Sequence, residues 1–479
     1  MIQLSLRQKV LSGLRWSAGL RFLGQLLTWI ITIFVMRTLS PQDYGLMGMA
    51  GVFLAYLATV NELGLGAAIV QGTALNQRRL RQMFSLLLIT NGGLFLACIV
   101  LAPVIASFFR EPALVSLIRF LAIQFIITAF VVIPRSLTDR EMFFKQKSVI
   151  ELVSAIAGSL TTLVLAVNGW AVWSLVWGSL ILNLFMAVGF NLIKPSIFLP
   201  IISLRGMRQI IVFGGYVTVS RIIWAFYTRA DVLIVGKLLG QRLLGFYSVA
   251  LNLASLPMEK ISGIINQVAF PAFASIQTDV ETSASHFLKA IRLMSLAAFP
   301  SLWGISCISE DLVNTLLGDK WASVILPLQI LSLVIPVRMI SNLMSPMLLG
   351  VGRPDIQLFN VILYSITLPS GFLLGTRWGI VGVSLIWAMI FPLTFLFNMS
   401  RAVTVLRISL YGIVRQMIGP SAAAAIMYIT VSFLKAGLSE VSQIPRLILC
   451  ITGGAVVYAG SVTILAKDTC REALALLHN

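Results

Sequence analysis

Long apolar segments recur along the whole chain, and short polar loops separate them. Each segment is close to twenty residues long, which is enough to cross a bilayer as an α-helix. The pattern predicts about fourteen such helices. They are expected near residues 14–38, 44–70, 83–107, 114–134, 149–167, 170–192, 209–235, 243–270, 288–308, 323–348, 357–375, 379–398, 411–434 and 445–466. The segments are longer than the roughly ten-residue alternating strands of a membrane barrel, so the predicted fold class is an all-α polytopic membrane protein.

The composition agrees with a chain that lies almost wholly in the membrane. Of the 479 residues, 58% are hydrophobic and 11% are charged, whereas about 25% of the residues of a soluble domain are charged. The four cysteines form no CxxC pair. We therefore expect free thiols and no metal site.

The net charge of +18 follows from membrane orientation. About nineteen Lys and Arg residues fall in loops on the side of the N-terminus, and about eight fall in loops on the other side. Because cytoplasmic loops are enriched in these residues, both termini are predicted to be cytoplasmic and the protein to cross the inner (plasma) membrane many times. The same bias accounts for most of the positive charge without nucleic acid as a partner.

The chain contains an internal repeat. A shift of 200 residues aligns Gly45 with Gly245, and further on a shift of 210 aligns GWAVWSLVWGSLI (169–181) with GIVGVSLIWAMIF (379–391). Two parallel repeats around a central cavity are typical of transporters. The predicted domains are an N-terminal six-helix bundle at 1–200, a C-terminal six-helix bundle at 201–410, and two additional transmembrane helices with a cytoplasmic tail at 411–479.

The expected spans contain about eight cations but only three acids. Charge inside a membrane is costly, so such residues face a cavity or other helices and mark functional sites. A surplus of cations suits an anionic ligand, and arginine binds phosphate through two parallel hydrogen bonds. Arg21 and Arg221 are also matched by the repeat. The predicted substrate-binding residues are Arg21, Arg221, Arg229, Arg15 and Lys260.

The three acids are candidates for ion coupling, and these are Glu62, Glu259 and Asp231. Structural hydrogen bonding is an equal alternative for the two glutamates. Arg15 lies close enough to a span end that its side chain could instead reach the membrane surface.

Signatures of enzymes are absent from the sequence. It contains no HExxH, GxSxG or Walker A motif, and no acidic pair with DxD spacing. Glu310, Asp311 and Asp319 form a small acidic patch near the end of a span. We therefore predict that the protein is not an enzyme and needs no cofactor.

The stretch RTLSPQDYGLMGMAGVFLAYLATVNELGLGAAIVQ (37–71) resembles the end of the first span, the loop and the second span of Wzx-type flippases. These are polysaccharide exporters of the multidrug/oligosaccharidyl-lipid/polysaccharide (MOP) superfamily. The VGRPD loop (351–355) is similar as well. The resemblance covers nearly the whole chain, with fourteen spans in two bundles.

The resemblance implies that the protein moves a polyprenyl-pyrophosphate-linked oligosaccharide across the inner membrane for O-antigen, capsule or exopolysaccharide biosynthesis. By position, it assigns Arg21, Arg221 and Arg229 to a cavity that binds the substrate. The implied partners are the lipid-linked oligosaccharide, membrane lipids and other polysaccharide-assembly proteins.

Two alternatives stay open at this point. One is a small-molecule exporter of the same superfamily, which would be expected to have an acidic cavity. The other is an integral-membrane enzyme of polysaccharide assembly, which would need an acidic catalytic pair or a sizeable loop outside the membrane.

Overall fold

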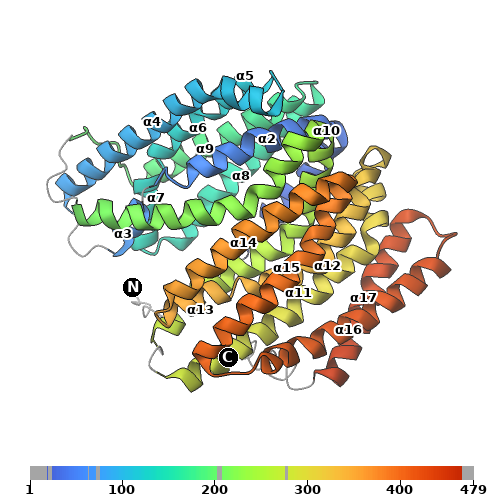
Figure 1. Ribbon diagram of the computed structural model, residues 1–479. Coiled ribbons are helices and arrows are strands. Elements are labelled where there is room, and N and C mark those ends of the chain that lie inside the picture. Colours follow the sequence, from blue (N-terminus) through green and yellow to red (C-terminus); the bar gives the residue numbers. More distant parts are fainter. Residues whose placement is uncertain are drawn as a thin grey trace, which may run out of the picture. The chain divides into compact units, whose positions relative to one another are not determined.

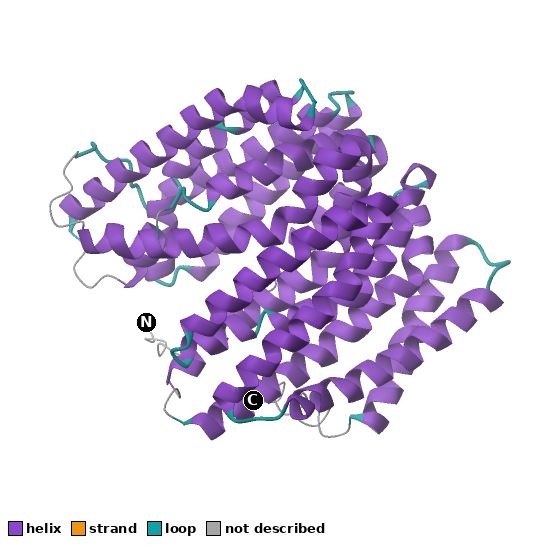
Figure 2. Cartoon of the chain, viewed as in Figure 1, coloured by secondary structure: helices purple, strands orange, loops and turns teal. Residues whose placement is uncertain are grey.

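The computed structural model describes Gly19 and residues 24–62, 64–71, 76–201, 208–275 and 279–466. Side chains are described in these ranges except at 67, 68, 71, 208–223, 225 and 259–275. The described residues form helices and loops, with no strand among them (Figure 2). The predicted all-α fold is confirmed.

Within the described ranges, nine helical segments are long and apolar enough to cross a membrane, or ten if a bent pair counts as one span. The bent pair consists of Leu114–Ala129 and Val132–Arg140, and a shorter apolar helix covers Gly24–Thr38. The protein is therefore a multi-pass membrane protein, and the predicted number of fourteen spans is approximate. Large apolar side chains such as Leu393 and Val456 are about 70% exposed, as expected for faces that contact lipid.

The chain divides into two compact units, Met1–Gly245 and Phe246–Asn479. The boundary falls inside helix α10 (Arg208–Ser275), which has a non-helical residue, Gly240, with φ of 81°. This break lies between the two spans predicted at 209–235 and 243–270. The predicted bundle limits at 200 and 410 stay a prediction.

The helices of the first unit follow one another with few residues between them (Figure 1). They are α2 (Pro41–Ala58), α3 (Leu65–Gln71), α4 (Gln77–Phe109), α5 (Leu114–Leu121), α6 (Ile123–Ala129), α7 (Val132–Arg140), α8 (Phe144–Val167), α9 (Val172–Ile193) and the first part of α10. Helices α8 and α9 pack tightly because both carry glycine at the contact. An added Cβ at Gly158 would lie 2.8 Å from the carbonyl oxygen of Gly178. Small residues allow this close approach of backbones in membranes.

The second unit continues with α11 and the helices that pack on it. They are α11 (Val280–Leu316), η1 (Asp319–Val324), α12 (Ile325–Ser341), α13 (Met344–Gly350), α14 (Pro354–Gly375), η2 (Thr376–Trp378), α15 (Gly379–Leu406), α16 (Leu410–Gly437) and α17 (Gln443–Leu465). Helix α11 contacts α12, α16 and α17.

Helix α2 begins at a reciprocal cap. The Ser40 hydroxyl accepts a hydrogen bond from the backbone N–H of Asp43, and the Asp43 carboxylate accepts one from the backbone N–H of Ser40 at 2.8 Å. Pro41 occupies the first helical position. Its fixed φ suits a helix, and the N–H that proline lacks would have no hydrogen-bond partner at this position. The predicted start of the second span at residue 44 is therefore three residues late.

The start of α2 packs closely against the chain segment around residue 241, and one glycine on each segment allows this close approach. A Cβ on Gly45 would lie 1.8 Å from the carbonyl oxygen of Gln241, and a Cβ on Gly245 would lie 1.7 Å from that of Pro41. Residue 241 occupies in the repeat the position that residue 41 occupies. In each contact, the glycine of one repeat meets the backbone four residues before the glycine of the other repeat. The two contacts are therefore equivalent, in agreement with the predicted repeat.

The second repeat match also has a backbone counterpart. Gly169 and Gly379 are aligned by the shift of 210, and both have positive φ, 80° and 64° respectively. Ser174 and Ser384, also aligned, are both fully buried. The matched tryptophans differ, since Trp177 is 36% exposed and Trp387 is buried. The two halves therefore share the turn at the glycine, but the environment of the matched tryptophan differs between them.

The acidic patch predicted near residue 310 is paired with cations. Asp311, fully buried on α11, accepts a hydrogen bond from Arg446 of α17 and lies 3.6 Å from the Lys435 ammonium of α16. Glu310 lies 2.7 Å from the same ammonium. These carboxylates therefore tie the last two helices to α11, which gives them a structural role.

Candidate functional site

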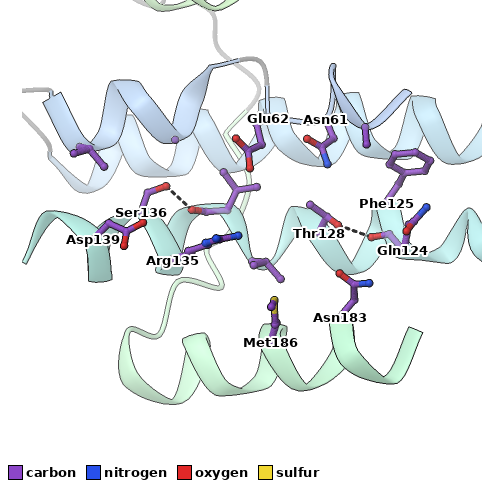
Figure 3. Close-up of a pocket in the computed structure, with 15 residues that line it drawn as sticks. Asn61, Glu62, Gln124, Phe125, Thr128, Arg135, Ser136, Asp139, Asn183 and Met186 are labelled. Atoms are coloured by element: carbon purple, nitrogen blue, oxygen red, sulfur yellow. Dashed lines mark hydrogen bonds between the residues drawn. The ribbon is translucent and has the colours of Figure 1, made fainter. Parts of the chain in front are cut away.

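The first unit contains a polar cavity of about 680 Å³ (Figure 3). It lies among α2, α3, α6, α7 and α9. Figure 3 shows Asn61 and Glu62 on one side of it, with Asn183 and Met186 on the opposite side. The lining residues are Ala58, Asn61, Glu62, Gly66, Val70, Gln124, Phe125, Thr128, Val131, Val132, Arg135, Ser136, Asp139, Asn183 and Met186.

An interrupted helix forms the first side of the cavity. Helix α2 ends at Ala58, α3 begins at Leu65, and Gly64 between them has φ of 68°. The backbone freed by this break has a partner, because buried Asn91 of α4 donates its amide N–H to the carbonyl oxygen of Asn61 at 2.9 Å. The break therefore presents Asn61 and Glu62 to the cavity instead of continuing the helix.

A second break lies across the cavity. Helix α7 is bent by 43° relative to the α5–α6 segment, and the break includes Phe130 and Val131. Asn191 of α9 donates its amide N–H to the carbonyl oxygen of Phe130 at 2.8 Å. Irregular backbone at membrane depth is tolerated where protein buries it or where it lines a cavity, and interrupted helices are common at transporter sites.

Helix α3 lies close to α7, and glycine allows this. A Cβ on Gly66 would lie 3.2 Å from the Ser136 hydroxyl and 3.7 Å from a carboxylate oxygen of Glu62. A core of Leu65, Ile69 and other buried apolar residues holds the two helices together. Any larger side chain at residue 66 would enter the space beside the Glu62 carboxylate.

The polar groups of the cavity suit a ligand rich in hydroxyls. Asn61, Gln124 and Asn183 carry amides, each of which both donates and accepts hydrogen bonds. The hydroxyl groups of Thr128 and Ser136 donate to backbone carbonyls one turn earlier, at 2.7 Å in each case, and can still accept hydrogen bonds. The volume lies within the range of about 300–1,000 Å³ that is usual for small-molecule sites.

The charges of the cavity are nearly balanced. Arg135 lies 3.8 Å from Glu151, and Asp139 lies 2.5 Å from the Lys147 ammonium. Glu62 is the remaining charged residue of the lining. The cavity thus has no excess of positive charge, and it is better suited to an uncharged polar group than to a pyrophosphate.

The structure places the predicted site residues in different situations. Glu62 lines the cavity. On α10, Arg229 is exposed and Asp231 is fully buried, so the two do not share a face. The Tyr56 hydroxyl of α2 donates to the carbonyl oxygen of Phe226 at 3.3 Å, next to this part of α10.

The other predicted residues lie partly or wholly outside the described structure. Arg15 and Arg21 fall outside the described residues. Arg221, Glu259 and Lys260 lie in α10, but their side chains are not described. The predicted roles of all eight residues, in substrate binding or in ion coupling, stay predictions.

The sequence reasoning missed most of the cavity. Arg135 and Asp139 follow the span predicted at 114–134 and were therefore expected in a loop. In the structure the chain bends at residue 130 and continues as helix α7 through Arg140, so both residues lie on a helix. Polar residues spaced along two expected spans, among them Gln124, Thr128 and Asn183, were the signal available in the sequence.

Residues 34–326 match a family model described as "Polysaccharide biosynthesis protein". The chain belongs to this family. It is 29% identical to the lipopolysaccharide biosynthesis protein WzxC of Escherichia coli (strain K12), over 80% of this chain and 78% of the relative. It is 25% identical to the teichuronic acid biosynthesis protein TuaB of Bacillus subtilis (strain 168), over 95% of each chain.

The structure of this chain superposes on solved structures of membrane transport proteins. The lipid II flippase MurJ in an inward closed conformation superposes with a TM-score of 0.76 at 12% identity, over 94% of this chain and 99% of that chain. An inward-facing multidrug resistance MATE family transporter of the MOP superfamily superposes with a TM-score of 0.62 at 16% identity, over 80% and 96%. The chain therefore has the fold of these two proteins, and the predicted likeness to Wzx-type polysaccharide proteins is confirmed by the family match and by WzxC.

Proposed function

We propose that this protein is a flippase that moves a polyprenyl-pyrophosphate-linked oligosaccharide across the inner membrane during surface polysaccharide biosynthesis. The observation that carries the proposal is the amide-lined cavity between two interrupted helices of a MurJ-like fold. Its groups match sugar hydroxyls, and its balanced charge suits a glycan. The family and the names of its relatives, which include a succinoglycan biosynthesis transport protein of Rhizobium meliloti, support this class of substrate.

In this proposal the two parts of the substrate bind at different places. The glycan occupies the cavity, with Glu62 as the candidate for ion coupling and Glu259 and Asp231 as alternatives. The pyrophosphate binds the predicted arginines, because their planar forks match phosphate oxygens. These are Arg21, Arg221 and Arg229, and Arg15 and Lys260 are the further predicted members of the set. Both termini lie in the cytoplasm, and flipping itself forms and breaks no covalent bond.

A small-molecule exporter is the second candidate. The observations in its favour are the MATE-like fold and the two acids in the cavity, Glu62 and Asp139. The ion pair of Asp139 with Lys147 weakens it, because a cation of the protein already neutralises one of the two carboxylates that would attract a cationic drug.

The deciding experiment is analysis of polyprenyl-pyrophosphate glycans in cells that lack the gene. We expect a completed repeat unit to accumulate and surface polysaccharide to be lost, and the wild-type gene to reverse both. A gene with Arg21→Ala and Arg221→Ala should not reverse them although its protein is abundant. Truncated units would indicate an assembly enzyme, and unchanged lipid-linked glycans would indicate a small-molecule exporter.

Replacing Asn183 by leucine should reduce export at least about tenfold, because a half-buried donor and acceptor for sugar hydroxyls is lost from the cavity lining. Asn168→Leu is the matched control, since Asn168 is exposed at the end of α8 and its amide donates to the carbonyl oxygen of Val164 in its own helix. Export is measured as surface polysaccharide per folded protein. Equal export by the two variants would contradict a role for the cavity in binding the glycan.

A further inference from the structure

The cavity of the first unit contains an open position beside Gly66, at the start of α3. A Cβ added to Gly66 would lie 3.2 Å from the Ser136 hydroxyl oxygen and 3.7 Å from a carboxylate oxygen of Glu62. Within 4 Å of this point, the described structure has no further atom except those of Gly66, its two chain neighbours and the backbone of its own helix. All three residues line the cavity, and Figure 3 shows Glu62 and Ser136 on facing segments. Oxygen atoms of two side chains therefore face one open position.

Both oxygens act as hydrogen-bond acceptors toward this position. The Ser136 hydroxyl donates its proton to the carbonyl oxygen of Val132 at 2.7 Å, so it presents its lone pairs to the cavity. An ionised carboxylate such as that of Glu62 has no donor, and its two oxygens accept from several directions at once. The position beside Gly66 therefore suits a cation or a hydrogen-bond donor and disfavours an anion.

The interruption between α2 and α3 adds negative partial charge on the same side of the cavity. Helix α2 ends at Ala58, which lines the cavity together with Asn61 and Glu62. The carboxyl end of a helix carries about half a negative elementary charge, and in transporters the ends of interrupted helices coordinate Na⁺. Asn61 lies beside Glu62 on this side of the cavity, and its amide oxygen is a further candidate ligand (Figure 3). The interrupted helix therefore favours a cation over a neutral donor.

The charges around the open position also favour a cation. Arg135 lies 3.8 Å from Glu151 of α8. Asp139 lies 2.5 Å from the Lys147 ammonium, which also belongs to α8. Among the described residues, the Glu62 carboxylate is the charged group that lies within 4 Å of the open position. A carboxylate at membrane depth is costly, and a bound cation offsets its charge, whereas a sugar hydroxyl donates a hydrogen bond without doing so.

The ligands indicate a monovalent cation. A carboxylate, a hydroxyl and an amide offer oxygen atoms, which suit hard cations and not the ions that prefer thiolate or imidazole. No group of three or more His, Cys, Asp or Glu side chains is placed to hold a metal ion in the part of the chain that the structure describes, whereas divalent sites usually contain several carboxylates. Na⁺ is the candidate because it is scarce inside cells, so its entry can drive the export of another molecule, whereas K⁺ is concentrated inside.

We propose that the open position in the cavity of the first unit is a binding site for Na⁺, with Glu62, Ser136 and Asn61 as ligands. The inference rests on the proposed function, because an ion can be coupled only to a transported molecule. Glu62 belongs to the interruption between α2 and α3, and Ser136 belongs to α7, which follows the second break. Na⁺ would therefore link the two interrupted segments across the glycan cavity, and its entry and release would change the space that the glycan occupies.

The test is thermal unfolding of the purified full chain in nanodiscs of uncharged lipid, in which NaCl replaces choline chloride at constant ionic strength. We expect Na⁺ to raise the unfolding midpoint, because a ligand that binds only the folded protein stabilises it. KCl should raise the midpoint less at every concentration. A midpoint that does not respond to Na⁺, or that responds equally to K⁺, overturns the proposal.

Three variants locate the response at this position. Glu62→Gln keeps the shape of the side chain but removes its charge, and it should abolish the response to Na⁺. Ser136→Ala should raise the Na⁺ concentration for a half-maximal response about tenfold, because it removes one neutral ligand. Gly66→Ala should weaken the response as well, because its methyl group would occupy the open position. If Glu62→Gln does not fold, the other two variants still test the site, and a response that survives unchanged in the folded variants overturns the proposal.

The matched controls alter the same chemical groups outside the cavity. Glu141→Gln removes the charge of an exposed carboxylate at the end of α7, which lies 2.6 Å from the Lys194 ammonium. Ser116→Ala removes an exposed hydroxyl of α5, which donates to the carbonyl oxygen of Ala113 at 3.1 Å. Both controls should keep the full response to Na⁺. Loss of the response in a folded control would place the ion elsewhere and would also count against the site.

The measurement needs no lipid-linked glycan, so it is independent of the test of the proposed function. Na⁺ binding without glycan accumulation in the deletion strain would refute the flippase function and not this site. Glycan accumulation without Na⁺ binding would refute this site alone.

Discussion

Replacing Gly45 by alanine will lower the free energy of unfolding by about 3 kcal/mol or more. The added Cβ would lie 1.8 Å from the carbonyl oxygen of Gln241, and a backbone atom cannot move aside as the end of a side chain can. Overpacking of this kind costs about 1–3 kcal/mol where side chains adjust, and more where they cannot. Gly245→Ala should have an effect of the same size, since its Cβ would meet the carbonyl oxygen of Pro41 at 1.7 Å.

Gly51→Ala is the control on the same helix. A Cβ at Gly51 has no neighbour within 4 Å, so alanine should be neutral or should stabilise α2 by up to about 1 kcal/mol. Thermal or denaturant unfolding of the three purified variants measures the difference. If Gly45→Ala unfolds like Gly51→Ala, then the close crossing does not exist in the folded protein.

The repeat that these two glycines share was visible in the sequence. Gly45 and Gly245 align at one shift, and Gly169 and Gly379 align at the next. Glycine is retained at such positions because a backbone approach or a positive φ excludes other residues, so the pattern survives where other side chains have diverged. The helical class was equally visible, because apolar segments of about twenty residues have the length that a helix needs to cross a bilayer.

The cavity could not be read from the sequence in the same way. Both of its interrupted helices lie inside apolar segments that were predicted as single spans. The break after Ala58 depends on Asn91, thirty residues beyond Asn61, whose amide satisfies the freed carbonyl. Hydropathy does not register such a hydrogen bond. Glu62 was identified because a carboxylate in a membrane span is conspicuous on its own, whereas Gln124 and Asn183 acquire meaning only when the helices meet.

The attachment of the last two helices, α16 and α17, could not be predicted from the sequence either. They carry no charge at the centre of their spans, so the sequence assigns them no part in transport. The pairing of Asp311 with Arg446 and Lys435 connects positions more than 120 residues apart, and no spacing rule predicts it. The structure thus gives α16 and α17 a specific attachment to α11.

Replacing Arg446 by methionine should lower the free energy of unfolding by about 3–5 kcal/mol, because it removes the closest partner of a fully buried carboxylate. Among the residues that the structure describes, Asp311 would keep the Lys435 ammonium as its cationic partner, at 3.6 Å. We expect less folded protein in the membrane, with export per folded molecule unchanged, because α16 and α17 serve the structure. Unfolding of the purified protein and quantification of membrane protein beside surface polysaccharide measure the two effects.

Two further variants decide whether the buried pair is the cause. Glu310→Gln alters the exposed member of the same network and should cost at most about 1 kcal/mol. Replacing Asp311 and Arg446 together by leucine removes both charges and should restore most of the stability lost in the single variant, since apolar residues often substitute well for a buried ion pair. If Arg446→Met has no larger effect than Glu310→Gln, the attachment of α16 and α17 does not depend on this pair. If export per folded molecule falls in the stable double variant, the two helices take part in transport after all.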